Sequence, residues 1–465
     1  MKTYDELKYE VKNGFCGISE AEKSEMFAFC DDYKEYLGKG KTERQCCNLS
    51  LKLAESAGFV PLTSKTSLVA GDKVYSINRG KGIILAVIGQ DAVSAGTNIV
   101  GAHIDVPRLD LKPNPLYEDG GFAMFKTHYY GGIKKYQWTA IPLSIHGTII
   151  KADGSSVDIS IGEDADDPVF CISDLLPHLA QDQMQKKMSE AIPGEGLNVV
   201  IGNIPDEDKD AKERVKYYTL KILHEKYGIT ETDFISAEIQ IVPAFMPRDI
   251  GFDRSMLAGF GQDDRVCSFA ALRAVMEIEN PKRTAICLLV DKEEVGSMGN
   301  TGMKSRFFEN FIAKLCSLQT ENYNDLLTRD ALSNSMCLSA DVCAAWDPNY
   351  PEVKEKRNSA IMNCGFQITK YTGARGKSGA SDASAEYVGK VRKIMDDAGV
   401  MWQTGLLGKV DLGGGGTIAQ YVANLDVDVI DCGVPLLSMH APYEVAGKVD
   451  IFMSYKAYRA FMMSK

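Results

Sequence analysis

The pattern of hydrophobic and polar positions predicts helices at the start of this chain and strands soon afterwards. Within the first ~60 residues, apolar positions recur with the helical period. Ser19 and Glu22 have the spacing of a capping box, and residues 43–57 show the pattern of a second amphipathic helix. The run VYSINRGKGIILAVIG predicts a hairpin, with a glycine-containing turn between two strands. The run TNIVGAHIDVP predicts a buried strand that ends in polar residues.

The character of the chain changes at about residue 106 and again at about residue 248. In between, alternating runs such as TAIPLSIHGTIIKADG and SSVDISIG predict strands, and a charged helix is expected near 208–227. From 248 onwards strands alternate with helices, which is typical of a mixed or parallel sheet covered on both faces, with ligands outside the C-terminal strand ends. The elements expected there are a helix at 265–279, strands at 284–290 and 335–340, a helix at 381–398, a strand at 427–432 and a helix near 448–463.

Length and composition narrow the class of protein. A chain of 465 residues is too long for one simple core and indicates two domains, or one domain with a large insertion. With 45% hydrophobic and 25% charged residues the chain is ordinarily globular, and a net charge of −11 argues against nucleic-acid binding. The N-terminal run MKTYDELKYEVKNG lacks the apolar core of a signal peptide, and no apolar run reaches the ~18 residues of a membrane span. We therefore expect a cytoplasmic protein.

The twelve cysteines form no Cys-x-x-Cys pair, so the sequence does not favour a zinc site made of thiolates. Several of them lie inside apolar runs, such as Cys287 in TAICLLV. We expect buried, reduced thiols.

Two of the six histidines follow predicted strands. His103 ends the apolar run TNIVGA, and His440 follows the strand at 427–432 after a short loop. A metal site needs neutral imidazole and carboxylate ligands held rigidly at one end of a sheet. On extended backbone, residues two apart point to one side, so Asp105 could accept the second ring N–H of His103 and set its tautomer. A lone His-x-Asp pattern also occurs by chance.

Two adjacent glutamates, Glu293 and Glu294, follow the strand TAICLLV. Burying both charges is costly without a cation. A division of labour is one solution, in which Glu294 binds a metal and Glu293 holds the attacking water as general base. A solvated loop is the ordinary alternative.

Two aspartates complete the candidate set. Asp263 opens the helix at 265–279, where a carboxylate is favoured by the helix dipole alone, although it could also bridge two metals. Asp341 stands at the end of the strand SMCLSA, a typical place for a ligand. The full set suits two metals with three protein ligands each and one shared aspartate, about 3.5–4 Å apart. Its imidazole and carboxylate groups favour zinc, with manganese or cobalt as alternatives.

Six motifs stand out along the chain: GAHIDVPRLDLKP, YYGGIKKYQW, GQDDRVCSFAAL, DKEEVGSMG, SADVCAAWDPNY and LLSMHAPYE. They occur in the order found in metallopeptidase family 18, the aspartyl aminopeptidases and vacuolar aminopeptidase I, and the chain resembles a bacterial-type member over essentially its whole length. The resemblance implies a metalloaminopeptidase that removes N-terminal residues from peptides. It implies an α/β, zinc-peptidase-like catalytic domain, here residues 1–105 and 248–465, interrupted by a β-rich dimerisation domain at 106–247. It also implies dimers that assemble into a homo-oligomeric dodecamer.

The resemblance also implies a role for each candidate. One metal would be held by His103, Asp263 and Asp341, and the other by Asp263, Glu294 and His440. Glu293 would be the general base and Asp105 would orient His103. The expected substrate-binding residues are Lys370 in FQITKYTGA, Gly415 within the glycine-rich stretch 411–417, and His128, which could reach the active site of a neighbouring subunit.

Specificity is the point at which the chain departs from the family pattern. Eukaryotic aspartyl aminopeptidases carry a histidine three residues after the aspartate ligand, and here that position is Ala344. The preferred N-terminal residue is therefore either acidic or broad and neutral. Two other functions stay open: a two-metal amidohydrolase related to aminoacylases, and a non-catalytic shell-forming assembly.

Overall fold

The computed structural model describes residues 2–373 and 375–465, apart from the side chains of Asp5 and Glu6. Contacts divide the chain into two compact units. The first comprises the residues up to Asp105 together with Pro247–Met439 and Glu444–Lys465. The second comprises Val106–Met246 and the short segment His440–Tyr443.

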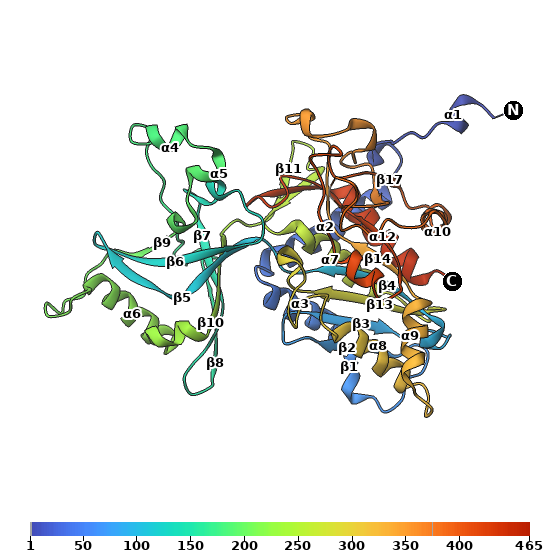
Figure 1. The fold of residues 1–465 in the computed structure, drawn as a ribbon, viewed down its shortest axis with the longest axis horizontal. Coiled ribbons are helices and arrows are strands. Elements are labelled where there is room, and N and C mark those ends of the chain that lie inside the picture. Colours follow the sequence, from blue (N-terminus) through green and yellow to red (C-terminus); the bar gives the residue numbers. More distant parts are fainter. Residues whose placement is uncertain (1, 374) are drawn as a thin grey trace. The chain divides into compact units, whose positions relative to one another are not determined.

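The first unit is built on a nine-stranded mixed sheet (Figure 1). Its strand order is β1-β2-β3-β13-β4-β14-β18-β16-β17. The four central strands, β13, β4, β14 and β18, run parallel, whereas β3 and β16 pair antiparallel at their flanks. The bounds are β1 Val60–Pro61, β2 Lys73–Ile77, β3 Ile83–Val87, β4 Thr97–His103, β13 Thr284–Val290, β14 Met336–Ala340, β16 Phe366–Thr369, β17 Trp402–Thr404 and β18 Asp428–Gly433.

Helices cover both faces of this sheet. The central strands carry apolar side chains on both faces, and each face is buried by helices. In β13, Cys287 and Leu289 belong to one buried cluster and Ile286 and Leu288 to the other. The first cluster includes residues of α2 (Glu20–Lys39), α3 (Glu43–Ser56), α7 (Gln262–Met276), α10 (Ala385–Asp397) and α12 (Lys448–Met463). The second includes residues of α8 (Phe307–Ser317), α9 (Asp325–Ser333) and α11 (Ala419–Ala423).

A smaller sheet of five strands also belongs to the first unit. Its order is β11-β12-β20-β19-β15. Strand β12 leads directly into α7, and β15 follows the end of β14. The bounds are β11 Arg248–Ile250, β12 Met256–Gly259, β15 Cys343–Ala344, β19 Pro435–Leu437 and β20 Glu444–Gly447.

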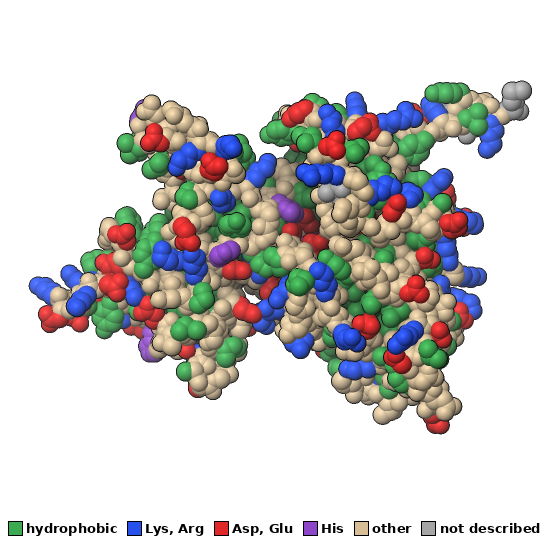
Figure 2. All heavy atoms as spheres, in the orientation of Figure 1, with side chains coloured by type: hydrophobic (Ala, Val, Ile, Leu, Met, Phe, Trp, Pro, Cys, Tyr) green, Lys and Arg blue, Asp and Glu red, His purple; other side chains and the backbone are tan. Residues whose placement is uncertain are grey.

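The second unit contains a six-stranded antiparallel sheet in the order β8-β7-β10-β5-β6-β9. Helix α6 (Arg214–Tyr227) belongs to the same unit. The bounds are β5 Arg108–Asp119, β6 Phe122–Tyr130, β7 Leu143–Ile150, β8 Ser156–Ile161, β9 Val199–Gly202 and β10 Ala237–Pro243. Figure 2 shows acidic and basic side chains interspersed over the visible face of each unit.

Most of the predicted elements of the first unit are confirmed, with small shifts at their ends. The predicted hairpin is the antiparallel pair β2–β3. At the start of α2, Ser19 accepts a hydrogen bond from the Glu22 amide, whereas Thr42 and Gln45 form a full capping box at α3. Ten of the twelve cysteines are buried, and all twelve are free thiols.

The predicted start of the charged helix was wrong. The prediction began at 208, whereas α6 begins at Arg214. The Asp206 side chain accepts the amide of Asp208, and the Asp208 side chain accepts the amide of Asp210. Aspartates that bond nearby amides in this way stabilise turns in competition with a helix.

Over the described residues, no helix combines the length and the hydrophobicity that crossing a membrane requires.

Candidate metal centre

His103 is the last residue of β4, and its two ring nitrogens face two different carboxylates. Nδ1 lies 3.2 Å from Oδ1 of Asp105 and 3.1 Å from the Asp105 carbonyl oxygen. Nε2 lies 3.2 Å from Oδ1 of Asp263. The ring is almost completely buried. This arrangement suits a ligand whose Nδ1–H is donated to Asp105, because the lone pair of Nε2 is then directed toward Asp263.

The pair Glu293–Glu294 forms a short turn directly after β13, and Asp105 holds that turn. One carboxylate oxygen of Asp105 accepts the amide of Glu293 at 3.1 Å, and the other accepts the amide of Glu294 at 3.2 Å. Lys292 enters the turn with a left-handed backbone, φ 67°. One buried carboxylate therefore connects the orientation of His103 to the backbone of both glutamates.

Asp263 and Asp341 arrive from two further elements. Asp263 lies in the first turn of α7, after Gly261, whose φ of 76° suits glycine. Asp341 follows β14, and its amide donates to the Cys432 carbonyl at 2.8 Å. Oδ1 of Asp341 lies 4.0 Å from Nε2 of His103. Oε2 of Glu293 lies at the same distance from that nitrogen.

Among the described residues, two groups of three have the geometry of a metal site. In each group, one ligand atom per residue lies within 4.8 Å of the ligand atoms of the other two. The first group is His103, Asp263 and Asp341, and the second is Asp263, Glu294 and His440. Asp263 is common to both.

His440 has its own orienting contact. It adopts a left-handed backbone with φ 64°. Its Nδ1 lies 2.9 Å from the carbonyl oxygen of Gly132. If Nδ1 carries the proton and donates it to this carbonyl, Nε2 keeps its lone pair for a metal.

The carboxylates crowded at this centre favour a nearby positive charge. Burial opposes the charged imidazole, yet hydrogen bonds to Asp105 and Asp263 raise the pKa of His103 well above its usual value. Burial, reinforced by the negative charges of Asp264 and Asp263, raises the pKa of Asp341. Burial also raises the pKa of Asp264. Such crowded carboxylates are relieved by protonation or by a cation, and imidazole plus carboxylate is a donor set that zinc accepts. The residues therefore fit divalent metal.

The predicted substrate residues lie outside these two groups. The Lys370 ammonium follows β16 and donates to Oδ1 of Asp382 at 2.7 Å and to the Ala383 carbonyl at 2.8 Å. The Gly415 carbonyl accepts the Gly373 amide at 3.0 Å. His128 lies on β6 of the second unit.

Two acidic residues near the ligands were not predicted from the sequence. Asp264 follows Asp263, and one of its carboxylate oxygens lies 3.4 Å from the His103 amide nitrogen. Glu444 was part of the motif LLSMHAPYE, yet no role was assigned to it. Its carboxylate accepts backbone amides at the start of α7. Glu444 is brought to that helix by the pairing of β12 with β20, and no local sequence motif indicates this pairing.

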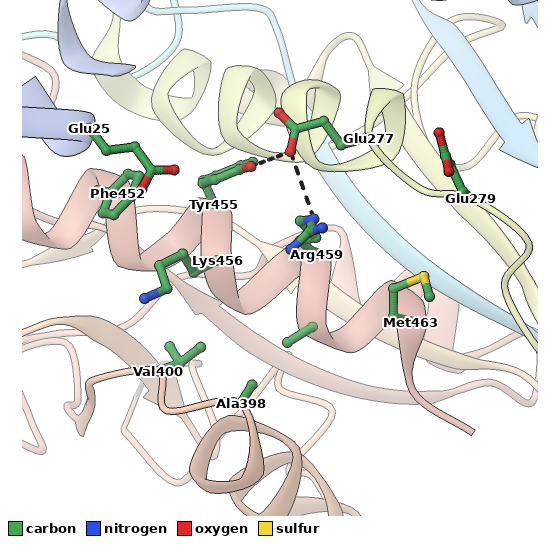
Figure 3. A pocket seen from close by; sticks show the side chains of 11 residues that line it. Glu25, Glu277, Glu279, Ala398, Val400, Phe452, Tyr455, Lys456, Arg459 and Met463 are labelled. Atoms are coloured by element: carbon green, nitrogen blue, oxygen red, sulfur yellow. Dashed lines mark hydrogen bonds and ion pairs between the residues drawn. The ribbon is translucent and has the colours of Figure 1, made fainter. Parts of the chain in front are cut away.

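A separate cavity of about 660 Å³ lies beside α12 (Figure 3). Glu277 is one of its lining residues, and its carboxylate contacts both Tyr455 and Arg459. Glu277 follows the C-terminal end of α7, whereas Asp263 lies at the N-terminal end. A helix of 15 residues is roughly 20 Å long, so this cavity is remote from the metal groups.

Comparison with known proteins gives the class of this chain. The family model described as Aminopeptidase I zinc metalloprotease (M18) matches residues 36–462. The "Probable M18 family aminopeptidase 1" of Clostridium acetobutylicum is 52% identical over 462 residues, covering 98% of this chain and 99% of that protein. The chain belongs to the M18 family of zinc aminopeptidases, which are metallopeptidase hydrolases.

Solved structures show the same fold. The crystal structure of an M18-family aminopeptidase from Thermotoga maritima has a TM-score of 0.95 and 46% identity, covering 98% of this chain and all of that one. A structure described as the S. cerevisiae mApe1 dodecamer has a TM-score of 0.75 at 21% identity, covering 93% of this chain and 95% of that one. These findings confirm the predicted family, the α/β fold class and the enzyme class. They do not favour the amidohydrolase or the shell protein.

Proposed function

We propose that this aminopeptidase acts with two divalent metal ions per chain, zinc in the first instance. His103, Asp263 and Asp341 would hold one ion, and Asp263, Glu294 and His440 the other. The observation that carries the proposal is the presence of Asp263 in both groups of three ligands. A carboxylate has two oxygens and can therefore bridge two ions.

Bound metal would supply Lewis-acid polarisation of the scissile carbonyl and a water of lowered pKa. The protein supplies the proton transfers. In this proposal the Glu293 carboxylate takes a proton from the attacking water and returns it to the leaving amine. Asp105 keeps the proton of His103 on Nδ1 and holds the backbone of Glu293.

The substrate is a peptide with a free N-terminus, and its N-terminal residue is acidic or of a broad, neutral class. Lys370 and the backbone around Gly415 would contact it from the first unit. His128 would act on the active site of a neighbouring subunit. The resemblance of each position to the family supports these roles. The residue at position 344, here Ala344, would decide between acidic and broad, neutral specificity.

We further propose a homo-oligomer, a dodecamer built from dimers through the β-rich domain at 106–247. The structure of the yeast mApe1 dodecamer, which has the same fold, supports this. Exposed apolar side chains in the second unit support it as well, because large exposed apolar groups mark interaction surfaces. Among them are Leu176, Leu179, Met184 and Met188.

The experiment that tests the catalytic proposal combines metal analysis with kinetics. The purified enzyme is dialysed against a chelator, and turnover of aminoacyl-anilides is measured before and after adding back zinc, manganese or cobalt. We expect activity to vanish and to return with two equivalents of metal per chain. Activity that survives thorough chelation would rule out the metal mechanism, and saturation at one equivalent would rule out the pair. Parallel N-acetylated anilides should not be cleaved, and cleavage of only these would indicate an amidohydrolase.

A further inference from the structure

Glu444, a residue outside both groups of candidate metal ligands, holds the backbone of Asp263. It is the first residue of β20 and pairs with Gly259 of β12, three residues before α7 begins. Its side chain is buried. A single oxygen, Oε2, accepts the amide of Gln262 at 2.6 Å and the amide of Asp263 at 3.2 Å.

The contact is reciprocal. The Gln262 side-chain amide donates to the Glu444 carbonyl at 2.6 Å and to the Leu257 carbonyl at 3.2 Å. Gln262 is therefore tied to β20 through both its backbone and its side chain. The amide of the residue that follows, Asp263, donates to the same carboxylate.

The start of α7 needs such a partner. The backbone at Asp263 (φ −79°, ψ 105°) and Asp264 (φ −118°, ψ 32°) is not helical, so the amides of Gln262 and Asp263 precede the regular part of α7 and need acceptors from elsewhere. Gly261, which comes before them, has no side chain that could accept them. Glu444 supplies the acceptor from another strand. A carboxylate is a strong acceptor for backbone amides.

The same arrangement occurs at the other turn that carries candidate ligands. Asp105 is buried, lies outside both ligand groups, and accepts the two consecutive amides of Glu293 and Glu294. Glu444 accepts the two consecutive amides of Gln262 and Asp263. Each turn is thus held by one buried carboxylate that reaches it from a different segment of the chain.

We infer that Glu444 is a positioning residue for Asp263, and that it sets the affinity of the chain for metal. This inference rests on the proposed function, because Asp263 matters only if it is the shared ligand. The carboxylate would act in two ways. It fixes the backbone from which the Asp263 side chain projects, and it adds one buried negative charge next to the ligands.

Two variants separate these contributions. Glu444→Gln keeps one side-chain oxygen that can accept both amides, removes the negative charge and replaces the other oxygen by an NH2 group. Glu444→Met has nearly the same shape and removes the acceptor as well. Loss of a residue that orients ligands typically weakens metal binding about 10- to 100-fold. We expect that range for Glu444→Met, and a smaller loss for Glu444→Gln.

A matched control exists in the same unit. Asp450, in the first turn of α12, is also buried, and it accepts the amides of Asn363 at 2.6 Å and Gly365 at 2.7 Å. The segment that it holds carries no candidate ligand. Asp450→Leu should therefore lower the melting temperature as Glu444→Met does, and leave the affinity for metal unchanged.

The measurement is the zinc dissociation constant of the full chain, obtained by competition with a chromophoric chelator, together with the melting temperature with and without zinc. With zinc at saturation, Glu444→Gln should have a kcat within about threefold of the wild type, since Glu293 is untouched. If both Glu444 variants bind zinc within twofold of the wild type, the inference is wrong. If Glu444→Met does not fold, Glu444→Gln decides by the same criterion.

Equal loss of affinity in Asp450→Leu would reduce Glu444 to a general stabilising residue. Failure of the wild type itself to bind zinc would refute the proposed function instead.

Discussion

Nε2 of His103 lies 3.2 Å from Oδ1 of Asp263. His103 ends β4 and Asp263 lies in the first turn of α7, so the contact joins the end of a strand to the start of a helix. On the opposite side of the ring, Nδ1 lies 3.2 Å from Asp105. The imidazole thus lies between two carboxylates, of which Asp105 would fix its tautomer and Asp263 would share its metal. The proposed mechanism gives the surrounding carboxylates two different roles, metal ligand and general base.

Glu293 and Glu294 should respond differently to the same substitution. Glu293→Gln should lower kcat at least about 100-fold and leave the metal content unchanged, because under the proposed mechanism it removes the base and no ligand. Glu294→Gln should lower the metal content as well, because Glu294 belongs to a ligand group. Kinetics and metal analysis on both variants check this. Undiminished turnover by Glu293→Gln would reject Glu293 as the base.

The glycine-rich stretch offers a pair of substitutions that separate folding from substrate binding. A Cβ on Gly415 would meet no atom within 4 Å, whereas a Cβ on Gly413 would lie 1.7 Å from the Leu407 carbonyl oxygen. We expect Gly415→Ala to keep the wild-type melting temperature and to raise KM if the backbone of Gly415 approaches the peptide. Gly413→Ala should lower the melting temperature. A wild-type KM in Gly415→Ala would remove this residue from the substrate site.

Strands were predicted well where a continuous apolar run identified them without knowledge of the neighbouring strands. The run TAICLLV became β13, Thr284–Val290, because a central strand of a covered sheet is apolar on both faces. Helix ends were predicted less well, since they depend on local side chains. Helix α10 begins at Ala385 and not at 381, because Ser384 caps it by accepting the amide of Tyr387.

The candidate ligands were recognisable in the sequence because each follows a strand or opens a helix next to the sheet. Their supporting contacts were not. Asp105 reaches the turn at Glu293 only because β4 and β13 are parallel neighbours. Glu444 reaches α7 only through the pairing of β20 with β12. Such long-range pairings are set by the whole fold and leave no local pattern in the sequence.

Ala344 gives a prediction on specificity. It lies on β15, three residues after Asp341, and its carbonyl accepts a hydrogen bond from the Lys354 ammonium at 2.9 Å. Ala344→His would restore the histidine of the eukaryotic aspartyl enzymes, and an imidazole there could bind an acidic side chain. We expect the ratio of kcat/KM for Asp-anilide to that for Ala-anilide to rise about 10-fold, the size of one added charged hydrogen bond. Ala344→Gln is the control, because it adds bulk and hydrogen bonding without a positive charge. An unchanged ratio in the histidine variant would remove position 344 from the specificity site.

Asp431 should make stability depend on pH in an unusual direction. It is buried on β18, and Oδ1 accepts the hydroxyl of Thr417 at 2.6 Å. Burial raises the pKa of Asp431 from 3.8 to about 6, despite the opposing effect of the Thr417 hydrogen bond. The folded protein therefore binds this proton more tightly than the unfolded chain. The resulting stabilisation is complete below about pH 3.8 and is lost as the pH rises through about 6.

The comparison with Asp431→Asn isolates this contribution, since the other titrating groups cancel in the difference. Between about pH 8 and about pH 5, the wild type should gain about 1 kcal/mol relative to the variant. Urea unfolding of both proteins after metal removal measures the difference without interference from the ligands. Thr417→Val should lower the stability at high pH further, because the ionised carboxylate then loses its hydroxyl donor. A difference that is flat between these two pH values would show that Asp431 titrates outside the window.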